Sequence, residues 1–317
     1  MTTTVFTKIM GIIEMTDLFN TGIIPAVNEY LLKKSKEERN YGSYWSASSA
    51  GYCMRLNIMR RLGVPKVPEL EDNATQTRIF EAGHIFHEWL QRITKDAGLS
   101  IASEVELQDE DLMIRGHFDD LVLVGGTVYK IDGDGKDLGY MTKGGKLILY
   151  DYKTAHSASF NYKKRQTEIG YYHKMQLGTY MYMLRKNEQQ GVLQEADMNG
   201  GYTTHDLKEA RILSISKDDL RMHEQQLLWS AKLEKEVYSY WSTLNGYWKA
   251  RTLPKCTCLE HDGGFLGKRS AKGKIYNDYM YKDPETGIEE PCSMAWMKKT
   301  KEEGLWGKDE SMQDTTK

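Results

Sequence analysis

Three segments of the sequence have the pattern of β-strands, and they constrain the fold more than any other feature. Residues 101–107 and 112–124 alternate and are rich in β-branched side chains, and residues 147–152 are apolar or aromatic almost throughout. Runs of this kind, separated by glycine-rich turns, predict neighbouring strands of one sheet. Asp-Gly and Gly-Gly sequences within residues 125–145 predict a hairpin-like insertion between the last two strands.

Helical signals lie on both sides of these strands. The serine-rich residues 46–49 predict the N-terminal cap of a helix. Apolar side chains at helical spacing predict a second helix that ends near Gly98. Residues 172–184 carry a row of side chains at i,i+4 positions, which predicts a third helix. A capping-box-like pattern at residues 216–219 predicts the start of a long fourth helix.

The composition indicates a globular chain with no strong preference for polyanions. Its 317 residues are enough to bury a sizeable core, and we expect a single domain with its core at about 45–250. Residues 251–317 are rich in Gly, Lys and turn residues, which predicts an irregular C-terminal extension. Because no apolar run is long enough to cross a bilayer and no basic leader is present, we expect a cytoplasmic protein with no membrane partner. The net charge of -2 requires any contact with nucleic acid to be local.

Two acids and a lysine on the last two predicted strands carry candidate chemistry. Asp119 lies within the second strand, and Asp151 and Lys153 close the third. Because side chains alternate along a strand, Asp151 and Lys153 share one side while Tyr152 points to the other. Hard divalent cations prefer carboxylate oxygens, so Asp119 and Asp151 are candidate ligands of Mg²⁺ or Mn²⁺, with Lys153 orienting water or stabilising charge. A lone strand acid near a turn is more often simply solvated.

Four motifs in a fixed order resemble the RecB-like and AddB-like branch of the PD-(D/E)XK nuclease superfamily. They are G-x-x-x-H at residues 83–87, G-x-x-D at residues 116–119, D-x-K at residues 151–153 and Q-x-x-x-Y at residues 176–180. The resemblance spans roughly residues 45–185. It implies an α/β fold with a restriction-endonuclease-like core, in which helices flank a central mixed sheet.

The resemblance also implies roles for individual residues. His87 is implied as a metal ligand on a helix, and Asp119 is preferred as a ligand over the adjacent Asp120. The backbone carbonyl of Tyr152 is implied to reach the metal, and Gln176 is implied to support the catalytic residues. By themselves, a helical histidine and a row of i,i+4 side chains are more often packing residues.

The implied activity is hydrolysis of DNA by an exonuclease acting on single-stranded or end-containing strands. Tyr172 and Tyr180 are candidates to stack on bases, and Lys163, Lys164 and Arg165 are candidates to contact phosphates. The branch includes enzymes of recombination, repair, CRISPR adaptation and phage replication, so the expected partners are DNA and proteins of those processes in a bacterial or phage-infected cell. The alternatives are a nuclease-fold module that binds DNA or protein without cutting, and a small-molecule phosphoesterase, for which no phosphate-cradling glycine loop is present.

The four cysteines form a second constellation. A Ser-x-Ser sequence followed by Cys53 in a C-x-R sequence resembles branch members that carry an iron–sulfur cluster and place three more cysteines after the core. Cys256, Cys258 and Cys292 fit that distribution, which implies a structural [4Fe-4S] centre that joins the N-terminal helix to the C-terminal extension. Zinc bound by the four thiolates and ordinary thiols are the two alternatives.

Overall fold

In the computed structural model, the chain divides into two compact units. The residues that the structure describes are 23–36, 43–62, 74–130, 140–186, 194–196, 202–204, 207–252, 254, 280–282 and 289–291. One unit comprises residues 1–40 and 69–85, and the other comprises residues 41–68 and 86–317. The expectation of one domain over residues 1–317 stays a prediction.

The described part of the first unit is helical. It holds α1 (Ile23–Lys36) and the first half of α3 (Ala74–Asp96). Within it, the Lys34 ammonium pairs with the Glu81 carboxylate at 3.0 Å. The second half of α3 belongs to the second unit and ends as predicted, with Gly98 in the left-handed region at φ +68°. All the predicted site residues lie in the second unit.

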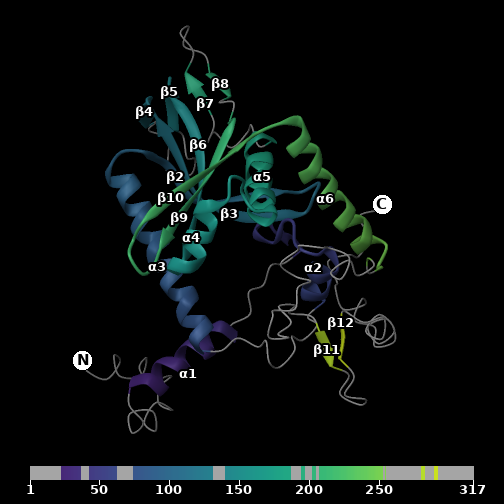
Figure 1. Ribbon diagram of the computed structural model, residues 1–317. Helices are drawn as coiled ribbons and strands as arrows, with labels where there is room; N and C mark the ends of the chain where they lie inside the picture. The colour runs from purple at the N-terminus through teal and green to yellow at the C-terminus, as the bar shows by residue number, and fades with distance from the viewer. Residues whose placement is uncertain are drawn as a thin grey trace, which may run out of the picture. The chain divides into compact units, whose positions relative to one another are not determined.

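A mixed sheet lies at the centre of the second unit, as predicted (Figure 1). Its described strands are β1 (Trp45–Ser46), β2 (Ser100–Asp109), β3 (Ile114–Val124), β6 (Lys146–Ala155), β9 (Glu209–Ser216) and β10 (Met222–Leu228). β3 pairs with β2 along one edge and with β1 and β6 along the other. β6 runs antiparallel to β3 and parallel to β9, which pairs with β10. β6 lies between β3 and β9 in the sheet, and the side chains of its residues 147–149 are buried.

A second, smaller sheet confirms the predicted insertion. β4 (Thr127–Lys130) and β5 (Tyr140–Lys143) pair antiparallel between β3 and β6. β5 also pairs with β7 (Gln194–Ala196), and β7 pairs with β8 (Tyr202–Thr204). Beyond residue 254, the structure describes β11 (Met280–Lys282) and β12 (Glu289–Pro291), which pair with each other.

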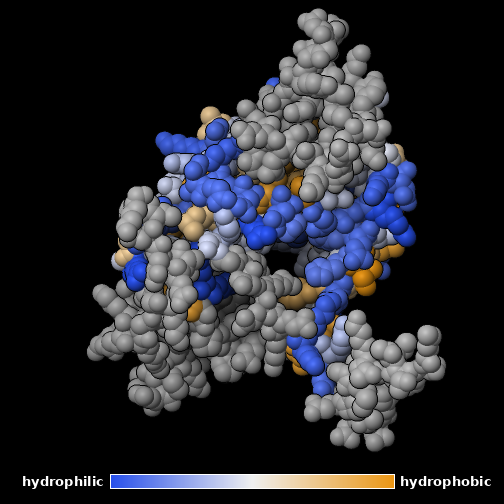
Figure 2. Space-filling model, turned by 180° about the vertical axis from the view of Figure 1, so that it is seen from behind, coloured by the Kyte–Doolittle hydropathy of each residue, from blue (hydrophilic) through white to orange (hydrophobic). Residues whose placement is uncertain are grey.

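Helices cover the central sheet in the second unit (Figure 1). α4 (Ser157–Arg165) and α5 (Tyr171–Lys186) pack against the sheet, and α6 (Ala231–Lys249) packs against α5. Gly178 permits the close approach of α6, because a Cβ there would lie 3.0 Å from Leu233 and Val237. Within the described ranges, no helix is both long and apolar enough to span a membrane. On the face in Figure 2, the described surface is mainly hydrophilic.

The helix predicted to start at residues 46–49 starts later. These residues form the end of β1 and the 3₁₀ turn η3 (Ala47–Ser49), and α2 (Met54–Arg61) begins after a break, so Cys53 precedes the helix. Gly51 lies in the break with a left-handed φ of +77°, and a Cβ there would lie in tight contact with Met175 of α5, at 3.0 Å. A glycine at this position therefore suits both the turn and the close approach to α5.

The capping box predicted at residues 216–219 is wrong. These residues turn the chain from β9 into β10, and the register pairs Ile215 with Met222. α6 begins only at Ala231, after Ser230 caps it by accepting a hydrogen bond from the Leu233 N–H. The ladder between two long strands outweighs a local capping pattern, because it satisfies many more backbone groups.

A buried cluster, which we call the Arg61 clamp, joins the N-terminal part of the second unit to α6. It consists of Trp45, Arg61, Asn245 and Trp248. The Arg61 guanidinium carbon lies 4.4 Å from the Trp45 ring centroid and 4.3 Å from that of Trp248. The Trp45 Nε1 donates to the Asn245 Oδ1, and the Asn245 Nδ2 donates to the Leu112 carbonyl, both at 2.7 Å. The clamp thus gives a half-buried cation two aromatic faces and a buried amide two partners.

Candidate functional site

Asp119 and Asp151 lie opposite each other on neighbouring strands. β3 and β6 pair with Asp120 beside Tyr150, so the antiparallel register brings Asp119 beside Asp151. Asp151 is 3% exposed, and the Lys153 Nζ lies 2.8 Å from its Oδ1 and 2.7 Å from its Oδ2. β6 continues to Ala155, so the two residues lie inside the strand and not at its end, where the sequence had predicted them.

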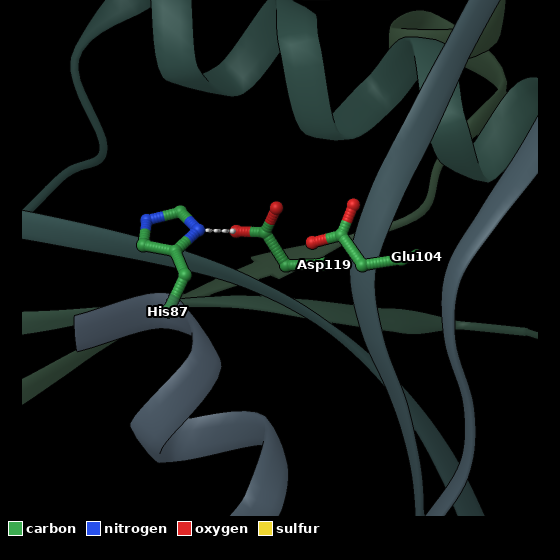
Figure 3. A group of neighbouring side chains, drawn as sticks. All are labelled: His87, Glu104 and Asp119. Atoms are coloured by element: carbon green, nitrogen blue, oxygen red, sulfur yellow. Dashed lines mark ion pairs between the residues drawn. The ribbon is translucent and has the colours of Figure 1, made fainter. Parts of the chain in front are cut away.

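His87 and Glu104 approach Asp119 from two other elements, α3 and β2 (Figure 3). The His87 Nδ1 lies 3.5 Å from the Asp119 Oδ2. One potential ligand atom from each of the three residues lies within 4.8 Å of the others. Glu104 was not predicted, and its φ of +53° interrupts the regular alternation of β2. These side chains form the acidic site together with Asp151 and Lys153.

Gln91 fixes the position of Glu104, and the sequence motifs did not include it. Its Nε2 donates to the Glu104 Oε1 at 2.6 Å and to the Asp119 backbone carbonyl at 3.1 Å. Gln91 follows His87 by four residues on α3, so both side chains lie on one helix face. That spacing was the available signal in the sequence.

The structure separates the roles of Asp119 and Asp120. Asp120 is fully buried on the other side of β3 and accepts hydrogen bonds from three hydroxyls. The donors are Thr94 at 2.6 Å, Ser100 at 2.5 Å and Tyr152 at 2.7 Å. Burial raises the pKa of Asp120, although these hydroxyls oppose the rise. Asp120 therefore ties α3, β2 and β6 together, and only Asp119 faces His87.

Crowding at the acidic site changes the pKa of two groups in opposite ways. The pKa of Asp119 rises to about 8, first because the group is buried and second because Asp151 is close. Asp119 is therefore largely protonated at neutral pH when no cation is bound. Burial lowers the pKa of Lys153, but the charges of Asp151 and Asp119 outweigh burial, and the pKa ends above its ordinary value. Lys153 is therefore an ammonium.

The G-x-x-D and Q-x-x-x-Y motifs meet in space. A Cβ at Gly116 would lie 3.1 Å from the Tyr180 hydroxyl, so the glycine makes room for that ring. Gln176 hydrogen-bonds to the Tyr180 hydroxyl, and the pKa of Tyr180 is raised by burial and by the charge of Asp151. At 4% exposure, Tyr180 offers no open ring face to a base. Its stacking role stays a prediction.

The predicted basic residues Lys163, Lys164 and Arg165 form the last turn of α4. Positive charge at this end of a helix interacts favourably with the helix dipole. Lys163 is half-buried, and burial and Lys153 lower its pKa, whereas Lys164 and Arg165 are exposed. His173 on α5 also faces this area and was not predicted. Its pKa falls to about 4, first because of burial and then because of Lys153 and Lys163. It lies three residues before Gln176, on the same helix face.

Of the four cysteines, only Cys53 falls within the described residues. It is half-buried and lies directly before α2. Cys256, Cys258 and Cys292 lie outside the described residues. Arg55 donates from Nη1 to the Pro254 carbonyl at 3.1 Å, so the chain leading to Cys256 passes beside α2.

The acidic site fits a hard divalent cation. Its donors are three carboxylates and one imidazole, and oxygen-rich sets of this kind suit Mg²⁺ and Mn²⁺. The buried Oδ2 of Asp151 accepts no hydrogen bond, since its contact with Lys153 is an ion pair without hydrogen-bond geometry. A buried oxygen in that state is costly unless further positive charge reaches it.

Comparison with known proteins points the same way. Residues 137–258 match the family model of the PD-(D/E)XK nuclease superfamily, a stretch that includes Asp151 and Lys153 but not His87 or Asp119. No curated protein matches the chain. A solved structure, titled "Crystal structure of SSO0001", is similar over 74% of this chain and 94% of that one at 15% identity, but its TM-score of 0.38 is too low to support an argument. The central mixed sheet flanked by helices is consistent with the fold of the PD-(D/E)XK nuclease superfamily, which residues 137–258 resemble, and that resemblance suggests a metal-dependent nuclease.

Proposed function

We propose that this protein is a metal-dependent exodeoxyribonuclease that hydrolyses phosphodiester bonds in single-stranded or end-containing DNA. The observation that supports this most is the meeting of Asp119, Asp151 and Lys153 on adjacent strands. His87 and Glu104 add donors beside them. Paired carboxylates next to a fixed cation are what metal-assisted hydrolysis of a phosphodiester requires.

The acids serve to bind Mg²⁺ or Mn²⁺, which supplies a Lewis acid and lowers the pKa of a bound water. We assign Asp119 and Asp151 as principal ligands, with His87, Glu104 and the Tyr152 carbonyl completing the set. Asp119 would hold the ion in its charged form, because only the deprotonated carboxylate is a good ligand.

Lys153 stabilises negative charge and orients the attacking water in this proposal. As an ammonium beside Asp151, it cannot accept the proton of that water. Gln176 positions Tyr180 beneath the carboxylates. His173 is neutral at neutral pH, so it can donate a hydrogen bond without adding charge.

DNA contacts are proposed at the ends of α4 and α5 that face the acidic site. Lys163, Lys164 and Arg165 would contact phosphates on either side of the scissile bond, because phosphate charge dominates affinity. Tyr172, half-buried in the first turn of α5, is assigned to base stacking. The proteins of recombination, repair or replication remain the proposed partners.

Cleavage assays with end-labelled oligonucleotides test the function. Single- and double-stranded DNA is incubated with the protein in Mg²⁺, Mn²⁺ or EDTA, and product ladders distinguish removal from an end from internal cuts. Lys153→Ala should abolish cleavage, whereas Lys232→Ala, an exposed lysine on α6, should not. Binding without cleavage in every metal would favour the non-cutting module, and full activity of Lys153→Ala would remove the nuclease proposal.

We also propose that Cys53, Cys256, Cys258 and Cys292 bind a structural [4Fe-4S] cluster. The hydrogen bond from Arg55 to Pro254 supports it, because it holds the chain two residues before Cys256 beside the segment of Cys53. Protein purified without oxygen should be brown and contain about four iron atoms per chain. Zinc in place of iron, or colourless metal-free protein, would contradict the cluster and leave the nuclease proposal untouched.

A further inference from the structure

Three tyrosines from two distant segments gather in the second unit, and we call them the tyrosine cluster. Tyr52 precedes α2, and Tyr171 and Tyr172 begin α5. The rings of Tyr52 and Tyr172 stack with centroids 4.9 Å apart and 19° between their planes. Tyr171 meets Tyr172 edge-on at 6.0 Å.

The backbone at Gly51 brings the tyrosine cluster together and leaves the Tyr171 ring partly exposed. Gly51, beside Tyr52, has a φ of +77°, and a Cβ there would lie 3.2 Å from the Tyr171 Cε1. Only glycine therefore lets the loop approach α5 so closely. Tyr171 is nevertheless 48% exposed, whereas Tyr52 and Tyr172 are half-buried. The stacked rings of Tyr52 and Tyr172 thus form a fixed support, and Tyr171 presents ring surface to solvent.

The cluster borders the acidic site. The Tyr52 phenol is close enough to Lys153 to contribute to its pKa. His173, the residue after Tyr172, is close enough to Lys153 and Asp151 for both charges to act on its pKa. Two neighbouring segments therefore place aromatic rings within electrostatic reach of Lys153.

Two cationic side chains lie next to rings of the tyrosine cluster. The Arg60 guanidinium lies 5.8 Å from the Tyr52 ring centroid, and the Lys174 Nζ lies 5.2 Å from that of Tyr171. Aromatic side chains mixed with positive charge are the composition of surfaces that bind single strands, because the rings stack on bases while the cations hold the backbone. The Lys174 ammonium also pairs with the Glu236 carboxylate at 2.8 Å, so a DNA phosphate would have to compete with that ion pair.

We propose that the tyrosine cluster, with Tyr171 outermost, stacks on an unpaired base of the strand whose phosphate lies at the acidic site. The proposal rests on the proposed nuclease function and adds a substrate preference to it. A tyrosine ring can cover a base only where that base has no stacked neighbour, which holds at an unpaired end and not inside a duplex. The cluster therefore selects single-stranded DNA.

Binding without turnover tests this directly. A ten-nucleotide strand carrying one 2-aminopurine, free or within a duplex, is titrated with protein in calcium in place of magnesium, and stacking is read as fluorescence quenching. Tyr171→Ala and Tyr52→Ala should reduce the quenching and weaken single-strand binding about five- to fifty-fold. Duplex binding should change little, and Tyr171→Phe should behave as the original protein.

The control is Tyr238→Ala, a tyrosine of α6 that is 52% exposed and neighbours Tyr182. No quenching by the original protein, or equal losses in Tyr171→Ala and Tyr238→Ala, would overturn the proposal. So would unchanged quenching in both Tyr171→Ala and Tyr52→Ala. Because the assay needs no cleavage, a protein that quenches the single strand but cuts no DNA in magnesium would refute the nuclease function and retain the stacking surface.

Discussion

The Arg61 clamp and the acidic site lie in the same unit, and both bury polar side chains. The clamp supplies its buried amide with hydrogen-bond partners, whereas the acidic site places carboxylates next to one another. In the clamp, Asn245 is 5% exposed and has partners for both its oxygen and its nitrogen. In the acidic site, Asp119 and Asp151 face each other. Burial, and after it the nearby charge of Asp151, raises the pKa of Asp119 to about 8. Satisfied polar groups stabilise a fold, whereas crowded like charges cost stability until a cation binds.

The largest effect is expected at the acidic site. Asp151→Asn should lower kcat/KM on single-stranded DNA about a thousand-fold, because it removes the charge of a principal ligand. The metal-free protein should also lose about 1–3 kcal/mol of stability, because the Lys153 ammonium loses the charge of its paired carboxylate. Kinetics in magnesium measure the loss of activity, and thermal unfolding in EDTA measures the loss of stability. Activity within about ten-fold of that of the original protein would contradict the assignment of Asp151 as a principal ligand.

The next effect is expected in the clamp. Asn245→Ala should lower the free energy of unfolding by about 2–4 kcal/mol, because the Trp45 Nε1 and the Leu112 carbonyl lose their partner while buried. The folded fraction should retain normal kcat/KM. Urea unfolding measures the change, with Ser242→Ala on the exposed side of α6 as the control. Equal losses of unfolding free energy in the two variants would contradict a stabilising role of the Asn245 hydrogen bonds.

A smaller effect concerns pH. The folded-state pKa of Asp119 is raised, so its contribution to stability is fully present below about pH 4 and is lost as pH rises through about 8. In EDTA, Asp119→Asn should therefore gain about 1–3 kcal/mol relative to the original protein between pH 5 and pH 8. Unfolding curves across that range measure it, and saturating Mn²⁺ should abolish the gain. A constant difference at all pH values would contradict the raised pKa.

The smallest effect is expected from Glu104. Glu104→Gln should weaken Mn²⁺ binding about ten-fold, because one charged donor is lost while others remain. Glu106→Gln is the matched control, since that exposed residue of β2 pairs with Arg115 at 2.7 Å. Calorimetry measures both. Unchanged Mn²⁺ affinity in Glu104→Gln would remove it from the proposed ligand set.

Strand patterns predicted much of the site, because alternation fixes which side chains share a face. Asp151 and Lys153 form an ion pair on one side of β6, and the Tyr152 hydroxyl reaches Asp120 on the other. The choice between Asp119 and Asp120 depends on the register with β6 and on the hydroxyls around Asp120. The local sequence contains neither the register nor these hydroxyl contacts. Only the resemblance to the nuclease family therefore favoured Asp119 over Asp120.

Other residues escaped prediction because their positions depend on contacts across the fold. Glu104 reaches the site through a left-handed backbone conformation and a hydrogen bond from Gln91 on another element. Residues 216–219 look like a cap, yet strand pairing makes them a turn. Tyr52 follows Gly51, which has a left-handed conformation and lies in tight contact with α5.

By itself, the sequence determined where the long strands of the sheet lie and which side chains share a face of β6, because hydrophobic period and turn residues act locally. Tertiary structure alone decided which acid faces His87, that Glu104 joins it, and that Tyr52 meets Tyr172. Those outcomes depend on strand register and on the packing of helices against the sheet. Both arise between segments far apart in the chain, where no local pattern records them.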